Sequence, residues 1–246
     1  MRIALRIGMV CAAGLLCFVA AGCAHSGSIA GSQISAAKAA EAGGGPKGLE
    51  LLKEGNQRFV SGRAINPSTD AETLRVAAEK GQHPFVAVLS CSDSRVPVER
   101  VFDRGAGEIF VVRVAGNVTS KNETGSIEYS MEALKVPLLV VMGHTQCGAV
   151  KAACAGASLT PNIDSFLANI QPAVQRVKAS QPGLEKNKEA FEVAVIEENV
   201  RQTLRDLYAT SPLIREQVST GKVEVALAMV DISNGQVSWL NEVPRP

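Results

Sequence analysis

The sequence predicts an α/β domain with a mainly parallel central β-sheet flanked by helices and an antiparallel hairpin at its C-terminal edge. Residues 85–90 and 138–142 are short apolar runs, typical of strands buried on both faces of a parallel sheet. Segments with helical periodicity alternate with such runs. Near the end of the chain, Asn234 and Gly235 separate two strand-like segments, which indicates a tight hairpin turn.

The elements follow this alternation along the chain. Residues 49–60 carry an amphipathic helical pattern, and a second helix at 71–80 has Asp70 as its cap and Gly81 at its end. The other predicted elements are strands at 85–90, 108–113, 138–142, 223–232 and 237–240, and helices at 97–102, 124–134, 148–155, 163–179, 190–208 and 213–220.

The charge balance argues against a nucleic-acid partner. The 246 residues include 25 Lys and Arg against 24 Asp and Glu, and these charges are spread along the chain. Nucleic-acid binding requires a concentrated basic surface, and the sequence has no basic run that would provide one.

The N-terminal segment predicts export. Arg2 and Arg6 precede an apolar stretch at 7–21, which is the pattern of a secretory signal peptide over residues 1–22. Residues 19–23 end in Cys23 and are similar to a bacterial lipobox, so we expect a lipid on Cys23 and a periplasmic, membrane-anchored protein. The alternative is ordinary cleavage near Ala24, which would release a soluble exported protein.

A flexible tether is predicted after the signal peptide. Residues 23–47 are rich in Ala, Gly and Ser and almost lack branched and aromatic side chains, so they cannot bury enough apolar surface to fold. The folded domain is therefore expected to span residues 48–246.

Chemically active side chains follow the two apolar runs. Cys91, Asp93 and Arg95 come directly after the first run, and His144 and Cys147 come directly after the second. Parallel strands present their carboxyl ends at one edge of the sheet, where binding crevices form. Two thiols and an imidazole are three ligands that suit zinc and leave its fourth position open, so we predict one Zn²⁺ held by Cys91, His144 and Cys147.

A disulfide between Cys91 and Cys147 is the structural alternative, because spare thiols pair in an oxidising compartment. A disulfide would not require His144, Asp93 and Arg95 at the same edge, so we favour the metal. The start of the following helix is expected to favour the Cys147 thiolate.

The spacing of Asp93 and Arg95 directly after Cys91 predicts that the two form a catalytic pair. An ionised carboxylate only accepts hydrogen bonds, so Asp93 can accept one from water at the open metal position. The planar guanidinium of Arg95 can hold that carboxylate with two bonds and keep it off the metal. If this pair broke, Asp93 could occupy the fourth position itself.

The segments at 91–97 and 143–150 together resemble the β-class carbonic anhydrases, and the resemblance extends over residues 49–240. It implies the three zinc ligands and the Asp93–Arg95 dyad named above. It also implies substrate-binding roles for Gln82 and Tyr129, and a homodimer or larger homo-oligomer with active sites near the subunit interface. The implied reaction is the reversible hydration of carbon dioxide to bicarbonate and a proton.

Some members of that family close their site by moving the aspartate onto zinc, with regulatory bicarbonate bound nearby. Their bicarbonate pocket uses a Trp and a Tyr where this chain has Val88 and Val230, and an Arg that Arg113 matches. The two departures predict a site that stays open.

Two other functions stay open from sequence alone. Relatives with the same zinc ligands hydrolyse carbon disulfide or carbonyl sulfide, and pocket shape separates these activities. A non-catalytic exported zinc-binding protein is the second alternative, although it would not require Asp93 and Arg95.

Overall fold

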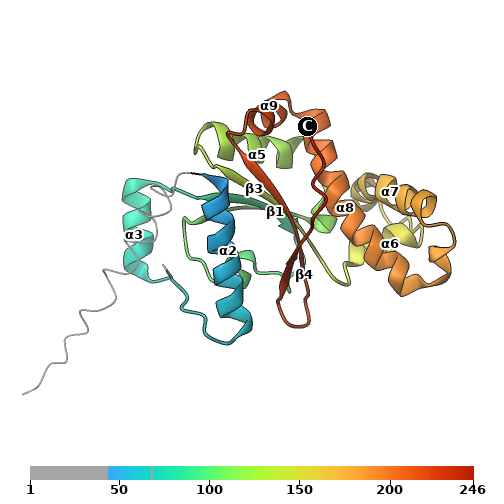
Figure 1. Ribbon diagram of the computed structural model, residues 1–246, viewed down its shortest axis with the longest axis horizontal. Helices are drawn as coiled ribbons and strands as arrows, with labels where there is room; N and C mark the ends of the chain where they lie inside the picture. The colour runs from blue at the N-terminus through green and yellow to red at the C-terminus, as the bar shows by residue number, and fades with distance from the viewer. Residues whose placement is uncertain (1–43, 68) are drawn as a thin grey trace, which may run out of the picture.

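The computed structural model describes residues 44–67 and 69–246. Its centre is a five-stranded sheet in the order β2-β1-β3-β4-β5 (Figure 1). Four strands are parallel and the last edge strand is antiparallel to its neighbour, which confirms the predicted fold class. The strands are β1 (Val86–Cys91), β2 (Ile109–Val114), β3 (Leu138–His144), β4 (Glu224–Val230) and β5 (Val237–Trp239).

Helices cover both faces of the sheet. The α-helices are α2 (Gly45–Val60), α3 (Ala71–Lys80), α4 (Val98–Val101), α5 (Lys121–Glu132), α6 (Gly148–Cys154), α7 (Pro161–Ser180), α8 (Lys188–Thr210) and α9 (Pro212–Ser219). Two short 3-10 turns, η1 (Ala115–Asn117) and η2 (Leu184–Lys186), join them.

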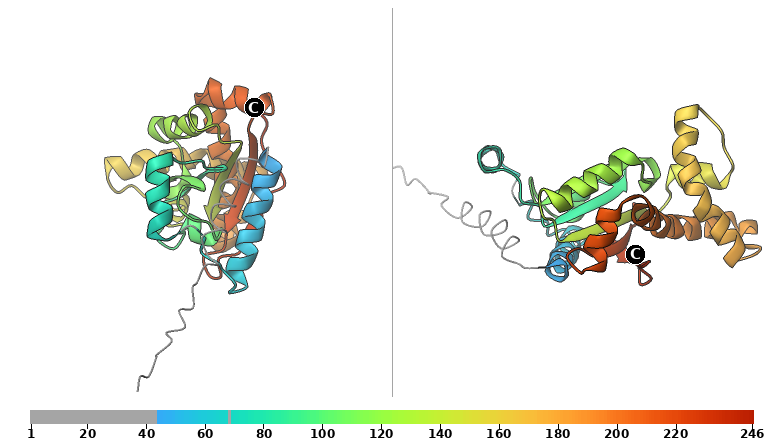
Figure 2. Two further views of the ribbon diagram at one scale, coloured as in Figure 1. Left: turned by 90° about the vertical axis from the view of Figure 1, so that its left-hand side faces the viewer. Right: turned by 90° about the horizontal axis from the view of Figure 1, so that it is seen from above.

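Side chains that alternate along each strand form two apolar cores. Val86 and Val88 face a core that includes Leu52 of α2, whereas Leu89 faces a core that includes Ile127 of α5. The period of two along a strand produces this division. Helices α3 and α7 lie at opposite ends of the molecule (Figures 1 and 2).

The functional strands end one or two residues later than the sequence indicated. Strand β1 ends at Cys91, and β3 continues to His144 because its last residue still pairs with Val230 of β4. Two of the three predicted ligands, Cys91 and His144, are therefore the final residues of buried strands, where neighbouring strands fix the backbone.

Helices α2 and α5 begin three or more residues earlier than predicted. Helix α2 begins at Gly45 rather than 49, so residues 45–47, assigned above to the tether, belong to the folded domain. Pro46 suits the first turn, which needs no N–H donor there, and a Cβ on Gly45 would lie 2.4 Å from Cβ of Glu224. Helix α5 begins at Lys121 because Ser120 and Glu123 form a capping box.

The C-terminal hairpin has a longer loop than the predicted two-residue turn. Val230 pairs with Val237, so six residues separate the strands. The carbonyl of Asp231 accepts hydrogen bonds from Asn234 N and Gly235 N, at 3.4 and 2.7 Å. Only Gly235 of the predicted pair has a positive φ, at 77°. Asp231, rather than an Asn-Gly turn, organises this connection.

None of the helices within residues 44–67 and 69–246 is both long and apolar enough to cross a membrane. The predicted signal peptide, and the tether up to residue 43, lie outside the described residues.

Candidate metal centre

Three side chains meet at the carboxyl edge of the sheet. Cys91 ends β1, His144 ends the adjacent strand β3, and Cys147 caps the start of α6. One ligand atom from each lies within 4.8 Å of the other two. The residues are 5%, 0% and 1% exposed. Neither cysteine is disulfide-bonded, so both sulfurs are available to a metal.

The imidazole of His144 is oriented for a metal. Its Nδ1 lies 2.9 Å from the carbonyl oxygen of Thr145, and only a protonated Nδ1 can donate to that acceptor. The lone pair is then on Nε2, which is buried without a hydrogen-bond partner among the described residues. A buried nitrogen without a partner beside two sulfurs fits a bound cation.

The two thiols cannot easily both ionise without that cation. The hydrogen bond from Cys147 lowers the pKa of Cys91 to about 4. The same contact and then burial raise the pKa of Cys147. Backbone N–H groups at the start of α6 act in the opposite direction and lower the pKa of Cys147, which is the effect expected from the start of a helix. A divalent cation would stabilise both thiolates.

Asp93 and Arg95 form the predicted pair beside these ligands. Arg95 Nε and Nη2 donate to the two carboxylate oxygens of Asp93 at 2.9 and 2.7 Å, and the Arg95 backbone N–H donates at 3.0 Å. The Arg95 bonds hold the pKa of the Asp93 carboxyl well below its usual range. Asp93 Oδ2 lies 3.8 Å from His144 Nε2, so the carboxylate borders the metal position while Arg95 holds it.

Arg113 shapes the loop that carries Asp93. Its Nε donates to the Cys91 carbonyl at 3.0 Å and its Nη2 donates to the Asp93 carbonyl at 2.6 Å. The sequence indicated this arginine only as a match to a regulatory pocket. In the structure its guanidinium binds the backbone of the ligand loop.

Gln82 and Tyr129 do not join the metal centre of their own protomer. Gln82 is exposed and precedes β1, so the whole strand separates it from Cys91. Tyr129 is 51% exposed on α5, with its ring centroid 6.1 Å from that of Phe110.

Gly116 and Asn199 lie behind the centre and carry no strong signal in the sequence. The Gly116 N–H donates to Cys91 Sγ at 3.3 Å, and Asn199 Nδ2 donates to the Gly116 carbonyl at 2.8 Å. Gly116 stands in a turn-like Ala-Gly-Asn segment, which is a weak signal. Asn199 lies inside a long amphipathic helix, where nothing in the sequence distinguishes it.

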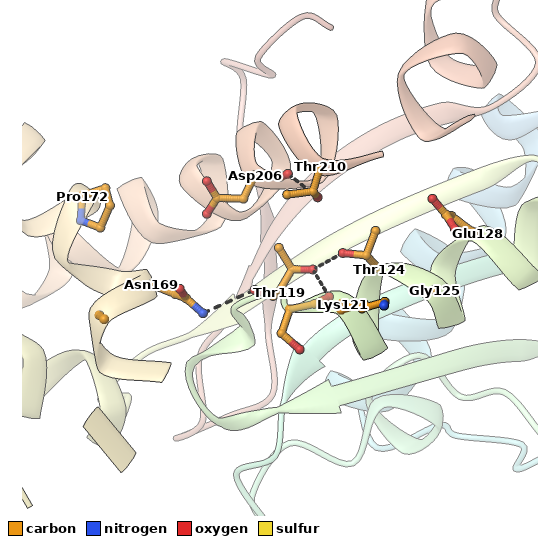
Figure 3. Close-up of a pocket in the computed structure, with 11 residues that line it drawn as sticks. Thr119, Lys121, Thr124, Gly125, Glu128, Asn169, Pro172, Asp206 and Thr210 are labelled. Atoms are coloured by element: carbon orange, nitrogen blue, oxygen red, sulfur yellow. Dashed lines mark hydrogen bonds between the residues drawn. The ribbon is translucent and has the colours of Figure 1, made fainter. Parts of the chain in front are cut away.

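A separate pocket of about 610 Å³ opens between α5, α7 and α8 (Figure 3). Two of its lining residues are joined by a hydrogen bond of 3.3 Å, from Asn169 Nδ2 to the Thr119 carbonyl. None of the predicted site residues lines this pocket, so the chemistry indicated by the sequence is located at the sheet edge instead.

The fold and the site define a class of protein: an α/β domain with one metal centre of two thiolates and one imidazole, and a carboxylate–guanidinium pair beside its open position. Comparisons with known proteins agree. A model of the carbonic anhydrase family matches residues 86–237. Carbonic anhydrase 2 of Mycobacterium tuberculosis is 38% identical over 194 residues, which cover 76% of this chain and 88% of that protein.

Solved structures show the same likeness. A β-carbonic anhydrase of Aspergillus fumigatus has a TM-score of 0.63 and 27% identity, covering 69% of this chain and 81% of that chain. One of two tetrameric β-carbonic anhydrases from Sordaria macrospora has a TM-score of 0.60 and 26% identity, covering 69% and 91%. The chain belongs to the carbonic anhydrase family, in its β class, and its cofactor is zinc.

Proposed function

We propose that this protein catalyses the reversible hydration of carbon dioxide to bicarbonate and a proton. The observation that carries the proposal is the Asp93–Arg95 pair beside the cluster of Cys91, His144 and Cys147. A site that only stores zinc would not require an oriented, ionised carboxylate next to an open ligand position.

Zinc, when bound by these three residues, supplies the Lewis acidity that lets a water molecule ionise near neutral pH. The protein's own groups orient the reaction. Asp93, kept ionised by Arg95, accepts a hydrogen bond from the reacting water and directs the oxygen lone pair away from the carboxylate. His144 stays neutral toward the metal because its Nδ1–H is bound to the Thr145 carbonyl.

We infer that the site is constitutively open. Arg95 donates to both oxygens of Asp93, which holds the carboxylate back from the fourth position of the metal. Val88 and Val230 are 0% and 1% exposed and belong to an apolar core, which offers no anion pocket. A crystal structure of the zinc protein near neutral pH tests this: an Asp93 oxygen bound to zinc would refute it.

The activity is tested on zinc-loaded protein at pH 7 and pH 8.5 by following carbon dioxide hydration. Cys147→Ser is expected to lose zinc and activity, because a hydroxyl is a poor zinc ligand. Cys154→Ser is the matched control, since Cys154 lies on α6 outside the cluster and should keep both. Retained metal and activity in Cys147→Ser would contradict the ligand assignment.

The same preparation tests the alternatives. Hydrolysis of carbon disulfide or carbonyl sulfide without hydration of carbon dioxide would assign the site to those substrates. One zinc per chain without any of these activities would favour a zinc-binding protein. Loss of all three activities in an Arg95→Ala variant that keeps its zinc would tie the reaction to the dyad.

A homodimer or larger homo-oligomer is proposed as the working state. Strand β2 is an edge strand with one unpaired side, and α3 buries none of its residues within the protomer. Gln82 and Tyr129, remote from their own centre, would then serve a neighbouring subunit's site. Light scattering measures the assembly, and a monodisperse, active monomer would refute the proposal.

Export with a lipid on Cys23 is proposed from the N-terminal sequence pattern alone. Metabolic labelling with a radioactive fatty acid in a bacterial host tests it. We expect label in the wild type and none in Cys23→Ala. Label absent from both, with cleavage near Ala24, would indicate a soluble exported protein instead.

A further inference from the structure

A hydrogen bond to sulfur connects the metal centre to a turn outside it. The sulfur of Cys91 accepts from the backbone N–H of Gly116 at 3.3 Å. Gly116 lies in η1, directly after β2, and has a φ of +72°, a left-handed conformation that favours glycine. The position of this N–H therefore depends on what holds the turn.

Two buried side chains of α8 hold that turn. Asn199 Nδ2 donates to the Gly116 carbonyl at 2.8 Å, across 83 residues of sequence. One helical turn later, Thr203 Oγ1 lies 3.0 Å from the Asn117 carbonyl oxygen and 2.9 Å from that of Asn199, so these two acceptors share its one proton. Asn199 and Thr203 are each 1% exposed, so α8 contacts two consecutive carbonyls of η1 without competition from water.

The turn is also enclosed on its other side. A Cβ added to Gly116 would lie 2.8 Å from Ile170 Cδ1 and 3.1 Å from Ala149 Cβ. Packing by α7 and α6 and hydrogen bonds from α8 thus fix the same peptide. A buried amide is costly in an apolar core unless it is bonded, so a plain core would have an aliphatic residue at 199.

We propose that Asn199 is a positioning residue of the metal centre, acting through Gly116 on the sulfur of Cys91. By fixing the Gly116 peptide, Asn199 directs the Gly116 N–H at the sulfur of Cys91. The N–H then orients the lone pairs of the sulfur and withdraws electron density from it. Outer groups that hydrogen-bond a metal ligand set its orientation and donor strength, and losing one typically weakens metal affinity about 10- to 100-fold. The inference rests on the metal centre of the proposed function and not on the substrate.

The test compares Asn199→Leu with Gln202→Leu on the full chain. Gln202 is a second amide buried on α8, and it binds Asp206 and Arg176 rather than the turn. Zinc affinity is measured by competition with a chelator. The protein is also loaded with Co²⁺, and its sulfur-to-cobalt charge-transfer absorption is recorded.

Asn199→Leu is expected to lose about ten-fold or more in zinc affinity and to shift the charge-transfer band to longer wavelength, because the sulfur lone pair is less stabilised. Gln202→Leu is expected to leave both unchanged. Equal changes in the two variants, or no change in Asn199→Leu, would overturn the proposal.

Thr203→Val keeps the shape of the side chain and serves if Asn199→Leu does not fold. It removes the donor to Asn117 and should move the band in the same direction by a smaller amount; an unchanged band would then overturn the proposal. These readouts do not involve carbon dioxide, so they separate failure here from failure of the proposed activity.

Discussion

Gly143 is the residue at which sheet packing and metal binding can be disturbed together. It directly precedes His144 in β3 and faces α8. A Cβ at this position would lie 2.6 Å from Val200 Cγ2 and 2.9 Å from Met229 Sδ. The methionine can move at little cost. Val200 cannot, because a β-branched side chain in a helix has one strongly preferred rotamer and this one is fully buried.

The expected cost of Gly143→Ala follows from these contacts. Overpacking a core costs about 1–3 kcal/mol, and a contact below 3.0 Å places this case near the upper value. Burying one methyl returns about 0.8 kcal/mol, and removing the backbone freedom of glycine returns about 0.5–1 kcal/mol. The net loss of unfolding free energy is then about 1–2 kcal/mol, and weaker zinc binding accompanies it as His144 shifts.

Urea unfolding and chelator competition measure the two effects. The control is Gly148→Ala, since a Cβ on Gly148 would meet nothing within 4 Å and alanine favours the helix it begins. Combining Gly143→Ala with Val200→Ala removes the colliding methyl, so the double variant should lose at least about 1 kcal/mol less than the sum of the two single losses. Additive losses would refute the steric reasoning.

Three further outcomes are expected. Thr145→Val removes the hydroxyl bonds to Asp231 and Ile232, of 3.3 and 3.1 Å, and should cost about 1–2 kcal/mol in urea unfolding while weakening zinc binding; unchanged zinc affinity would show that the hairpin does not support His144. Burial opposes ionisation of Asp103, but bonds from Arg58 and two backbone N–H groups hold the pKa of its carboxyl below the usual value. The ionised carboxylate therefore stabilises the folded protein above the unfolded pKa of about 3.9. This contribution is lost as pH falls through the lower folded pKa. In a pH series of unfolding experiments, the free energy of unfolding should fall less on acidification for Asp103→Asn than for the wild type. Equal decreases in the two proteins would count against this. Removing zinc with a chelator at pH 8 should lower the melting temperature, since a ligand that binds only the folded state stabilises it; an unchanged melting temperature would mean that the purified protein carried no bound metal.

The sequence was sufficient for the fold and for placing the three candidate metal ligands and the Asp93–Arg95 pair at one edge of the sheet. Buried parallel strands have near-continuous apolar runs, and the ligands follow such runs directly, so Cys91 and His144 could be placed at one edge without coordinates. Element boundaries were less accurate where local capping decided them, as at Ser120 and Pro46. The hairpin loop was misjudged because the side chain and carbonyl of Asp231 organise it, and Asn-Gly alone does not reveal that.

The supporting residues could not be predicted, because their roles depend on packing between distant segments. Asn199 meets Gly116 only after α8 packs across η1, and Arg113 meets the Cys91 carbonyl only once β1 and β2 pair. Gln82 and Tyr129 present a different case, since Gln82 precedes β1 and Tyr129 is 51% exposed, and the role proposed for them depends on a neighbouring subunit.

Helix α3 has ten residues and buries none of them in its own protomer. Peptide helices of that length are marginal in water, and the Asp70 cap on Thr73 is a small local contribution. The proposed homo-oligomer would cover α3 with a neighbouring subunit, so amide hydrogen exchange over residues 71–80 should depend on protein concentration, slow in the assembly and fast after dilution, while the sheet strands keep their protection. The exchange rate of the α3 amides would then report the fraction of subunits that are associated.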